Sequence, residues 1–371
     1  MILVESGPGT LPALFDNPRA VIRADAPSEV PAALEALDLA RSSGLWVAGM
    51  MSYELGYALE PRLAPLMPPL RDQPLLHFGA YDAPRPAPPM PDDASRIFAV
   101  TPSWDAAAYT PACARILDYI RAGDVYQANL TFPIHARWEG TPLGLHAALL
   151  RRQPVPHGAV VQLPDAPAVV SRSPELFFAT DAAGRIETRP MKGTAPRDPD
   201  PVRDAALRDA LGSSAKDRAE NLMIVDLLRN DISRVCRTGS VRVPDLYRVE
   251  TYATVHQMVS RITGDLIPGT SFSDILRALF PCGSITGAPK IRAMQIIRDL
   301  EPAPRGVYCG AVGWIAPDGS ASFNVAIRTL TLFPDGRARF GVGGGIVHDS
   351  TPEGEYEEAL WKARFTRPTS A

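Results

Sequence analysis

The chain has 371 residues, 46% of them hydrophobic, and a formal net charge of −3 at pH 7. A chain of this length can bury a large core, and its weak net charge gives no reason to expect a nucleic acid or a membrane surface as a partner. The first residues lack the basic start and apolar segment of a signal peptide, and no apolar run approaches the roughly 18 residues of a membrane-spanning helix. We therefore expect a cytoplasmic protein, whose four widely spaced cysteines are reduced thiols.

Residues 1–83 are predicted to form a small α/β part of the fold. Residues 28–43 carry apolar side chains at helical spacing, and Gly44 follows as a stop signal. The apolar run at 45–51 is typical of a buried strand.

A proline-rich segment follows at residues 84–91. Because proline fixes φ and removes a backbone donor, this segment is not expected in the interior of a sheet. We interpret residues 84–100 as a linker that leads to a larger domain at residues 101–366.

The larger domain combines helical and strand patterns. Residues 104–122 have helical periodicity, and residues 125–130 are a strand candidate. Pro-Asp-Gly turns at 317–319 and 334–336 are hairpin signals between the strands that we predict at 310–316, 322–333 and 337–342. These patterns predict an α+β fold in which large antiparallel sheets pack as a sandwich flanked by helices.

Two predicted helices carry carboxylates one turn apart. Asp217 and Glu220 lie in the helix expected at 214–236, and Glu355 and Glu358 lie in the last helix, with Lys362 one turn further. Such pairs suit Mg²⁺, which takes carboxylate oxygens. Helix capping and the helix dipole account equally well for Asp217 and Glu355, but not for the second member of each pair.

A single lysine, Lys192, lies in the segment Arg189–Arg197, after a hairpin predicted from strands at 176–179 and 185–188. Taken alone, this lysine fits a solvated loop. Taken with the acidic pairs, the glycines at 343–345 and the Thr-Gly-Ala-Pro-Lys segment at 286–290, it resembles the chorismate-utilising enzymes over roughly residues 100–365. Anthranilate synthases of this family carry alanine where this chain has Lys192, so the segment is similar to the aminodeoxychorismate synthases in particular.

The resemblance implies a site for chorismate, which is a dianion, and for Mg²⁺. It implies that Glu220 and Glu358 hold the metal directly, and that Asp217 and Glu355 act through water. Backbone amides of a glycine run can approach an anion closely, and an arginine offers a planar fork to a carboxylate. The positions that match the family's substrate contacts are Thr194, Tyr308, Arg328, Gly343, Gly344, Gly345 and Lys362.

The resemblance also implies a reaction, the replacement of the 4-hydroxyl of chorismate by an amine, in the transaminase class. Glu175 matches the general acid that helps the hydroxyl leave, and the neutral amine of Lys192 would attack ring C2 to form a covalent adduct. A lysine needs a lowered pKa for this role. His256 matches a family histidine near the enolpyruvyl side, and its role here stays open.

Gln127 stands where the family members that use water carry a base lysine, which argues against water as the nucleophile. No cysteine has the context of a glutaminase nucleophile, so ammonia is expected from solution or from a separate glutamine amidotransferase subunit. Two other interpretations remain. The chain could be an anthranilate synthase component I, or a non-catalytic regulator that binds chorismate.

Overall fold

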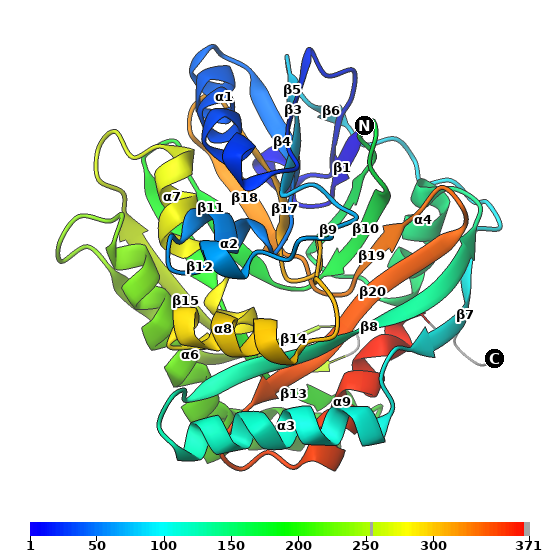
Figure 1. Cartoon of the computed structure of the whole chain (residues 1–371), viewed down its shortest axis with the longest axis vertical. Helices are drawn as coiled ribbons and strands as arrows, with labels where there is room; N and C mark the ends of the chain where they lie inside the picture. Colours follow the sequence, from blue (N-terminus) through cyan, green and yellow to red (C-terminus); the bar gives the residue numbers. More distant parts are fainter. Residues whose placement is uncertain (253–254, 367–371) are drawn as a thin grey trace.

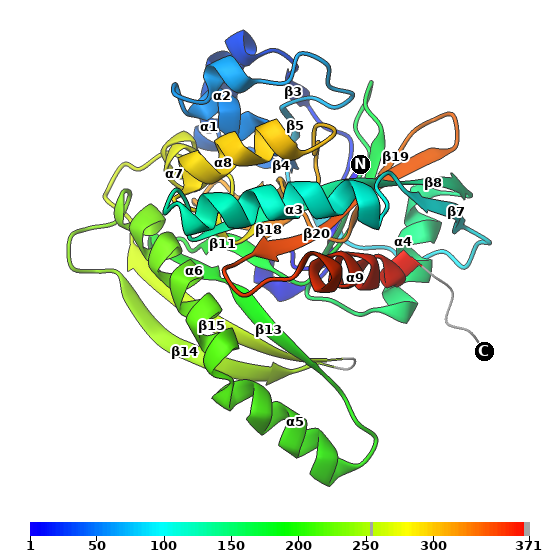
Figure 2. The same ribbon diagram turned by 60° about the horizontal axis from the view of Figure 1, so that its bottom comes forward.

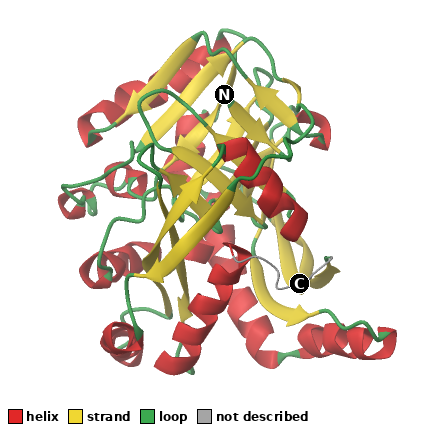
Figure 3. Cartoon of the chain, turned by 90° about the vertical axis from the view of Figure 1, so that its right-hand side faces the viewer, coloured by secondary structure: helices red, strands yellow, loops and turns green. Residues whose placement is uncertain are grey.

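The computed structural model describes residues 1–252 and 255–366, which form two large antiparallel sheets surrounded by helices (Figure 1). The strands occupy the middle of the molecule and the helices its periphery (Figure 3). The predicted α+β class is therefore confirmed. Within the described ranges, no helix is long and apolar enough to cross a membrane.

The first sheet has ten strands in the order β16-β8-β20-β19-β10-β9-β1-β2-β6, with β7 also paired to β8. Its long central pair joins β8 to β20 over ten residues, from Arg337 opposite Arg137 to Ile346 opposite Ala128. The strands of this sheet are β1 (Ile2–Val4), β2 (Ala13–Phe15), β6 (Arg85–Pro86), β7 (Arg96–Pro102), β8 (Gln127–Glu139), β9 (His157–Val161), β10 (Ala168–Ser173), β16 (Gly287–Ala288), β19 (Thr329–Leu332) and β20 (Arg337–Ile346).

The second sheet also has ten strands, in the order β13-β15-β12-β11-β18-β17-β4-β5-β3, with β14 paired to β15. Its strands are β3 (Ala20–Ala24), β4 (Trp46–Met51), β5 (Leu76–Tyr81), β11 (Leu176–Thr180), β12 (Arg185–Arg189), β13 (Met191–Pro196), β14 (Arg242–Thr251), β15 (Val255–Asp265), β17 (Ala311–Ile315) and β18 (Ala321–Val325). The ends of β13, β14 and β15 extend away from the body of the molecule together with helix α5 (Pro201–Ser213) (Figure 2).

The other helices start and stop where the local signals of the sequence place them. Ser214 caps α6 by accepting a hydrogen bond from the backbone of Asp217, and Thr351 caps α9 next to a proline at its first position. The helices are α1 (Val30–Ser42), α2 (Leu55–Leu59), α3 (Ala106–Arg121), α4 (Pro142–Arg152), α6 (Ala215–Ser233), α7 (Phe272–Leu279), α8 (Lys290–Leu300) and α9 (Pro352–Lys362).

One strand prediction is wrong. The segment 322–333 is not a single strand but two, β18 and β19, which belong to different sheets. The chain crosses from one sheet to the other at Arg328, whose φ of 51° is in the left-handed region and interrupts the extended backbone. Periodicity alone could not reveal this crossing because the residues on both sides of it are apolar.

The core consists of one layer between the sheets and one on the outside of each. The layer between the sheets holds the rings of Phe15 and Tyr81, whose centroids are 5.5 Å apart, and those of Trp46 and Trp314, 5.8 Å apart. Helices α1, α6 and α7 cover the second sheet, helices α3, α4 and α9 cover the first, and α8 contributes side chains to both outer layers. Burying each large apolar side chain contributes about 2 kcal/mol, so these layers hold the two sheets together.

Residues 1–83 contribute strands to both sheets. Strand β1 pairs with β9, and β4 pairs with β17. The proline-rich segment contributes only β6, a two-residue strand at the end of its sheet, where a missing backbone donor is tolerated. The division of the chain at residues 84–100 stays a prediction.

Candidate active site

Lys192 lies near the start of β13, beside carboxylates that come from three other segments. Burial lowers the pKa of Lys192, and the nearby charges are those of Glu220, Lys362, Glu175 and Glu358. The structure therefore brings together the lysine and the acidic residues that the sequence singled out. A lysine with a lowered pKa is more often neutral, and only the neutral amine is a nucleophile.

Gly193 explains how close helix α6 can come to this lysine. Its φ of 80° is in the left-handed region, and a Cβ at this position would lie 2.8 Å from Oδ1 of Asp217. Any larger residue would force the strand and the helix apart. Strand β13 thus contacts the first turn of α6 at Gly193.

Glu175 lies between β10 and β11 and is 4% exposed. Burial raises its pKa to about 7, while the hydroxyl of Ser284 and the charge of Lys192 act in the opposite direction. Its Oε1 has no hydrogen-bond partner among the described residues. A carboxyl group that keeps its proton near neutral pH and has one oxygen unsatisfied is suited to donate a proton to a bound molecule.

The acidic pairs of α6 and α9 influence one another. The pKa of Glu355 is raised, first by burial and then by the charges of Glu358 and Glu220, and Ser350 donates a 2.6 Å hydrogen bond that opposes the shift. Within the described ranges, no three acidic, histidine or cysteine groups are close enough to form a ready metal centre. Three mutually repelling carboxylates nevertheless offer the hard oxygen donors that Mg²⁺ prefers, so the residue types fit the ion. The magnesium assignment stays a prediction.

Lys362 and the glycine run of β20 meet at the same place. The Nζ of Lys362 donates to the carbonyl of Gly343 at 2.8 Å and lies 2.7 Å from Oε1 of Glu358. A Cβ at Gly344 would lie 2.9 Å from Oε2 of Glu355, and one at Gly345 would lie 2.8 Å from the side-chain amide of Gln127. The absence of side chains at these glycines therefore allows both charged and amide groups to approach the strand.

Gln127 is fully buried, yet neither atom of its side-chain amide has a hydrogen-bond partner among the described residues. Buried amides are nearly always bonded. Gln127 is therefore a candidate contact for a ligand that binds next to Gly345.

Arg328 and Tyr308 lie on the segments next to the crossing between the sheets. Burial lowers the pKa of Arg328 to about 10, and no carboxylate pairs with its guanidinium in the described part of the chain. Burial also raises the pKa of Tyr308, whose ring packs where a Cβ of Gly341 would otherwise lie, at 2.1 Å. A half-buried arginine without an acidic partner is an available anion contact.

His256 and Thr194 do not contact this cluster. The Nε2 of His256 lies 2.9 Å from Oδ1 of Asp204, and its Nδ1 lies 2.9 Å from the hydroxyl of Thr251. The hydroxyl of Thr194 donates to Oε1 of Gln257 at 2.9 Å. Asp204 carries no sequence signal, because it lies 52 residues from the histidine that it contacts.

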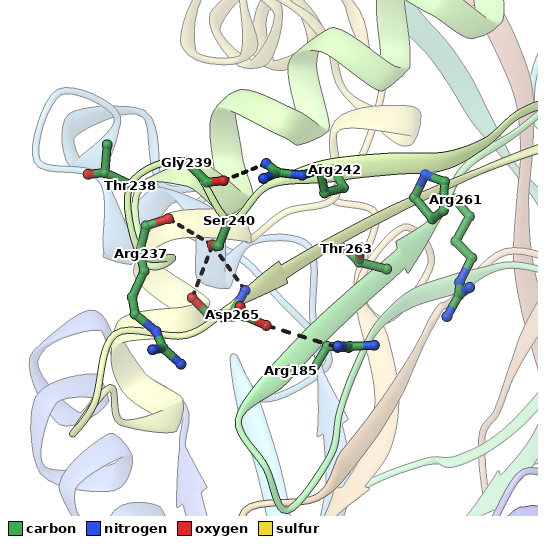
Figure 4. A pocket seen from close by; sticks show the side chains of 10 residues that line it. Arg185, Arg237, Thr238, Gly239, Ser240, Arg242, Arg261, Thr263 and Asp265 are labelled. Carbon is green, nitrogen blue, oxygen red and sulfur yellow. Dashed lines mark hydrogen bonds and ion pairs between the residues drawn. The ribbon is translucent and has the colours of Figure 1, made fainter.

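A hollow of the surface lies elsewhere. It has a volume of about 600 Å³ and is formed by the ends of β12 and β15 and the loop before β14 (Figure 4). Four arginines line it, Arg185, Arg237, Arg242 and Arg261, with Asp265 between them. None of the predicted site residues lines this hollow, so we place the candidate active site at Lys192.

Comparisons with known proteins identify the family of the chain. Residues 83–368 match the family of chorismate binding enzymes. The chain is 45% identical to aminodeoxychorismate synthase component 1 of Escherichia coli K12 over 71% of this chain and 59% of that one. It is 44% identical to the aminodeoxychorismate synthase of Streptomyces pristinaespiralis, over 76% of this chain and 39% of that one.

Anthranilate synthase relatives are also found. The chain is 42% identical to anthranilate synthase component 1 of Streptomyces coelicolor, over 71% of this chain and 52% of that one. The crystal structure of anthranilate synthase component I from Streptococcus pneumoniae matches with a TM-score of 0.83 and 26% identity, over 96% of this chain and 92% of that one. The matched part of the chain thus spans between 39% and 59% of the length of these curated relatives.

Proposed function

Because the chain belongs to the chorismate binding enzyme family, we propose that it is the chorismate-aminating component of an aminodeoxychorismate synthase. It converts chorismate and ammonia to 4-amino-4-deoxychorismate, an amine transfer of the transaminase class that leads to 4-aminobenzoate and folate. The observation that carries the proposal is Lys192, a partly buried lysine with a lowered pKa, beside the buried acid Glu175, whose pKa is raised to about 7.

Chorismate binds through its two carboxylates. Arg328, which has no acidic partner in the described ranges, forms a planar fork for one of them. The other lies near the glycine run of β20, where Lys362 and the amide of Gln127 converge. Tyr308 and Thr194 complete the proposed substrate contacts.

Glu220 and Glu358 would hold Mg²⁺, and Asp217 and Glu355 would support it through water. When bound, the ion neutralises a carboxylate of the substrate and so reduces the repulsion between the substrate and the acidic residues of the site.

The reaction then proceeds in two displacements. The amine of Lys192 forms a bond to ring C2, the two conjugated ring double bonds each shift by one position, and the bond from C4 to oxygen breaks. Glu175 gives its proton to the departing oxygen, so that water leaves. Ammonia next forms a bond to C4, both double bonds shift back, the bond from C2 to nitrogen breaks, and Lys192 is released. Glu175 and Lys192 recover their protonation states by exchange with solvent.

Ammonia comes from a glutamine amidotransferase partner. Relatives named component 1 support a division of labour between two components. The four cysteines of the chain are buried, which is unsuited to a glutaminase nucleophile that must reach glutamine.

The test is product analysis with the purified chain. Chorismate, Mg²⁺ and ammonium should give a product whose mass equals that of chorismate with one hydroxyl replaced by an amine, while glutamine should not replace ammonium. Anthranilate with release of pyruvate would instead assign the second candidate, anthranilate synthase component I, which the Streptomyces coelicolor relative favours. Binding of chorismate without turnover would instead indicate that the chain is a non-catalytic regulator.

A further inference from the structure

We propose that Asp204 and His256 form a latch between α5 and β15 that positions the strand carrying Lys192, and that Asp204 is therefore a positioning residue for the reaction. The inference rests on the proposed function, and it concerns a residue that no motif marks. The latch is formed by Asp204, His256, Arg197 and Thr251.

Both ring nitrogens of His256 are used inside the protein. The side chain is 1% exposed, with Asp204 at 2.9 Å from Nε2 and Thr251 at 2.9 Å from Nδ1. In the described ranges no contact joins this ring to Lys192, Glu175 or the acidic pairs. The two hydrogen bonds of His256 therefore connect β15 to helix α5 through Asp204 and to β14 through Thr251.

The charge of Asp204 fixes the direction of these hydrogen bonds. Arg197 donates to both of its oxygens, at 2.8 and 2.9 Å, and the backbone of Asp198 donates at 3.0 Å. These donors, Arg197 above all, hold the pKa of Asp204 well below its usual range. An ionised carboxylate can only accept, so Nε2 of His256 donates to it, and Nδ1 forms the second hydrogen bond of the ring, with the hydroxyl of Thr251.

The latch acts on Lys192 through the residue next to His256. The side-chain amide of Gln257 donates to the carbonyl of Gly193 at 2.7 Å, and it accepts from the hydroxyl of Thr194 at 2.9 Å. Strand β13 is the last of its sheet, and its register with β15 shifts between Met191 and Thr194. Lys192 therefore lies in an irregular stretch, whose position depends on how firmly β15 is held at residues 256 and 257.

The expected result is a loss of rate without a loss of substrate binding. Asp204→Ala should lower kcat by about ten- to a hundredfold, because a small displacement of a nucleophile costs this much. KM for chorismate should change less than kcat, because the proposed substrate contacts on β20 and α9 do not touch the latch and only Thr194 lies on the strand that it positions. Asp204→Asn keeps an oxygen acceptor for Nε2, so it should retain more activity than Asp204→Ala. Thr251→Val should lower kcat as well.

A double-mutant cycle separates positioning through His256 from general damage. In a His256→Gln background, Asp204→Ala should have almost no further effect on kcat. Asp198→Ala, which removes a neighbouring carboxylate that does not touch His256, is the matched control and should behave like the wild type. Circular dichroism and thermal unfolding check that each variant is folded. If Asp204→Ala does not fold, Asp204→Asn takes its place in the cycle.

Two results would overturn the latch. One is a double-mutant cycle in which the losses of kcat caused by Asp204→Ala and His256→Gln multiply. The other is a rise in KM with kcat unchanged in Asp204→Ala. Both require an active wild-type chain, so they are distinct from failure of the proposed function, in which wild-type protein with chorismate, Mg²⁺ and ammonium gives no aminated product.

Discussion

At the scale of single residues, burial prepares two groups for opposite tasks. It lowers the pKa of Lys192 and raises that of Glu175 to about 7. Both shifts favour the neutral forms, so they act against an ion pair between the two groups. These are the protonation states that attack at C2 and departure of the 4-hydroxyl require.

We expect Lys192 to form a covalent adduct when ammonia is withheld. With chorismate and Mg²⁺ alone, the intact mass of the chain should rise by the mass of chorismate minus water, and peptide mapping should place the addition on Lys192. Lys192→Ala should lose the adduct, whereas Lys216→Ala, which removes a neighbouring exposed lysine, should keep it. Normal turnover with an adduct on another residue, or with none, would contradict the role of Lys192 as nucleophile.

The part of adduct formation that depends on Glu175 should fall as the pH rises through about 7. The pKa of Glu175 is raised in the folded protein, so its proton is present below about pH 7 and is lost above it. Lys192 acts in the opposite sense, because its amine must lose a proton before it attacks, so the pH profile of the wild type is compared with that of Glu175→Gln. Ammonia is absent from this assay, so its own protonation does not enter. Glu175→Gln should lower the rate at pH 6 by at least about a hundredfold, and Glu187→Gln on β12 is the control. A Glu175→Gln profile with the same shape as that of the wild type would exclude Glu175 as the acid.

At the scale of secondary-structure elements, several helices and the hairpins at 317–319 and 334–336 were predictable, and the assignment of the strands to two sheets was not. The predicted helices at 28–43, 104–122 and 214–236 are confirmed as α1, α3 and α6, because capping residues and apolar spacing are local signals. The crossing at Arg328 and the contact of Asp204 with His256 were missed, because they depend on a backbone conformation and on residues far apart in the sequence. The family resemblance supplied the candidate site, since the acidic pairs alone fit capping equally well.

Helices α6 and α9 each supply a carboxylate for the proposed metal. Glu220→Gln and Glu358→Gln should each weaken Mg²⁺ binding, measured by calorimetry without substrate, by about tenfold or more. Each should also raise the Mg²⁺ concentration needed for half-maximal turnover. Glu353→Gln, which changes an acid in the first turn of α9, is the matched control. Wild-type Mg²⁺ affinity in both glutamine variants would contradict the assignment of Glu220 and Glu358 as metal ligands.

At the scale of the whole molecule, the N-terminal strands form one end of each sheet. The sequence suggested a small N-terminal part and a linker, and the pairing of β4 with β17 and of β1 with β9 shows how closely that part joins the rest. Sheet membership could not be inferred from the sequence, because an apolar strand such as residues 45–51 fits either sheet equally well.

The pairing of the N-terminal strands with later ones limits how the chain can be shortened. A fragment that begins at residue 84 would lack β1 to β5, so β17 and β9 would become open edges with unpaired backbone groups and apolar faces. Such edges promote association between copies of a chain. We expect this fragment to aggregate on gel filtration and to regain a soluble state when residues 1–83 are expressed with it as a separate piece. A soluble, monomeric fragment on its own would show that the later strands can close their sheets unaided.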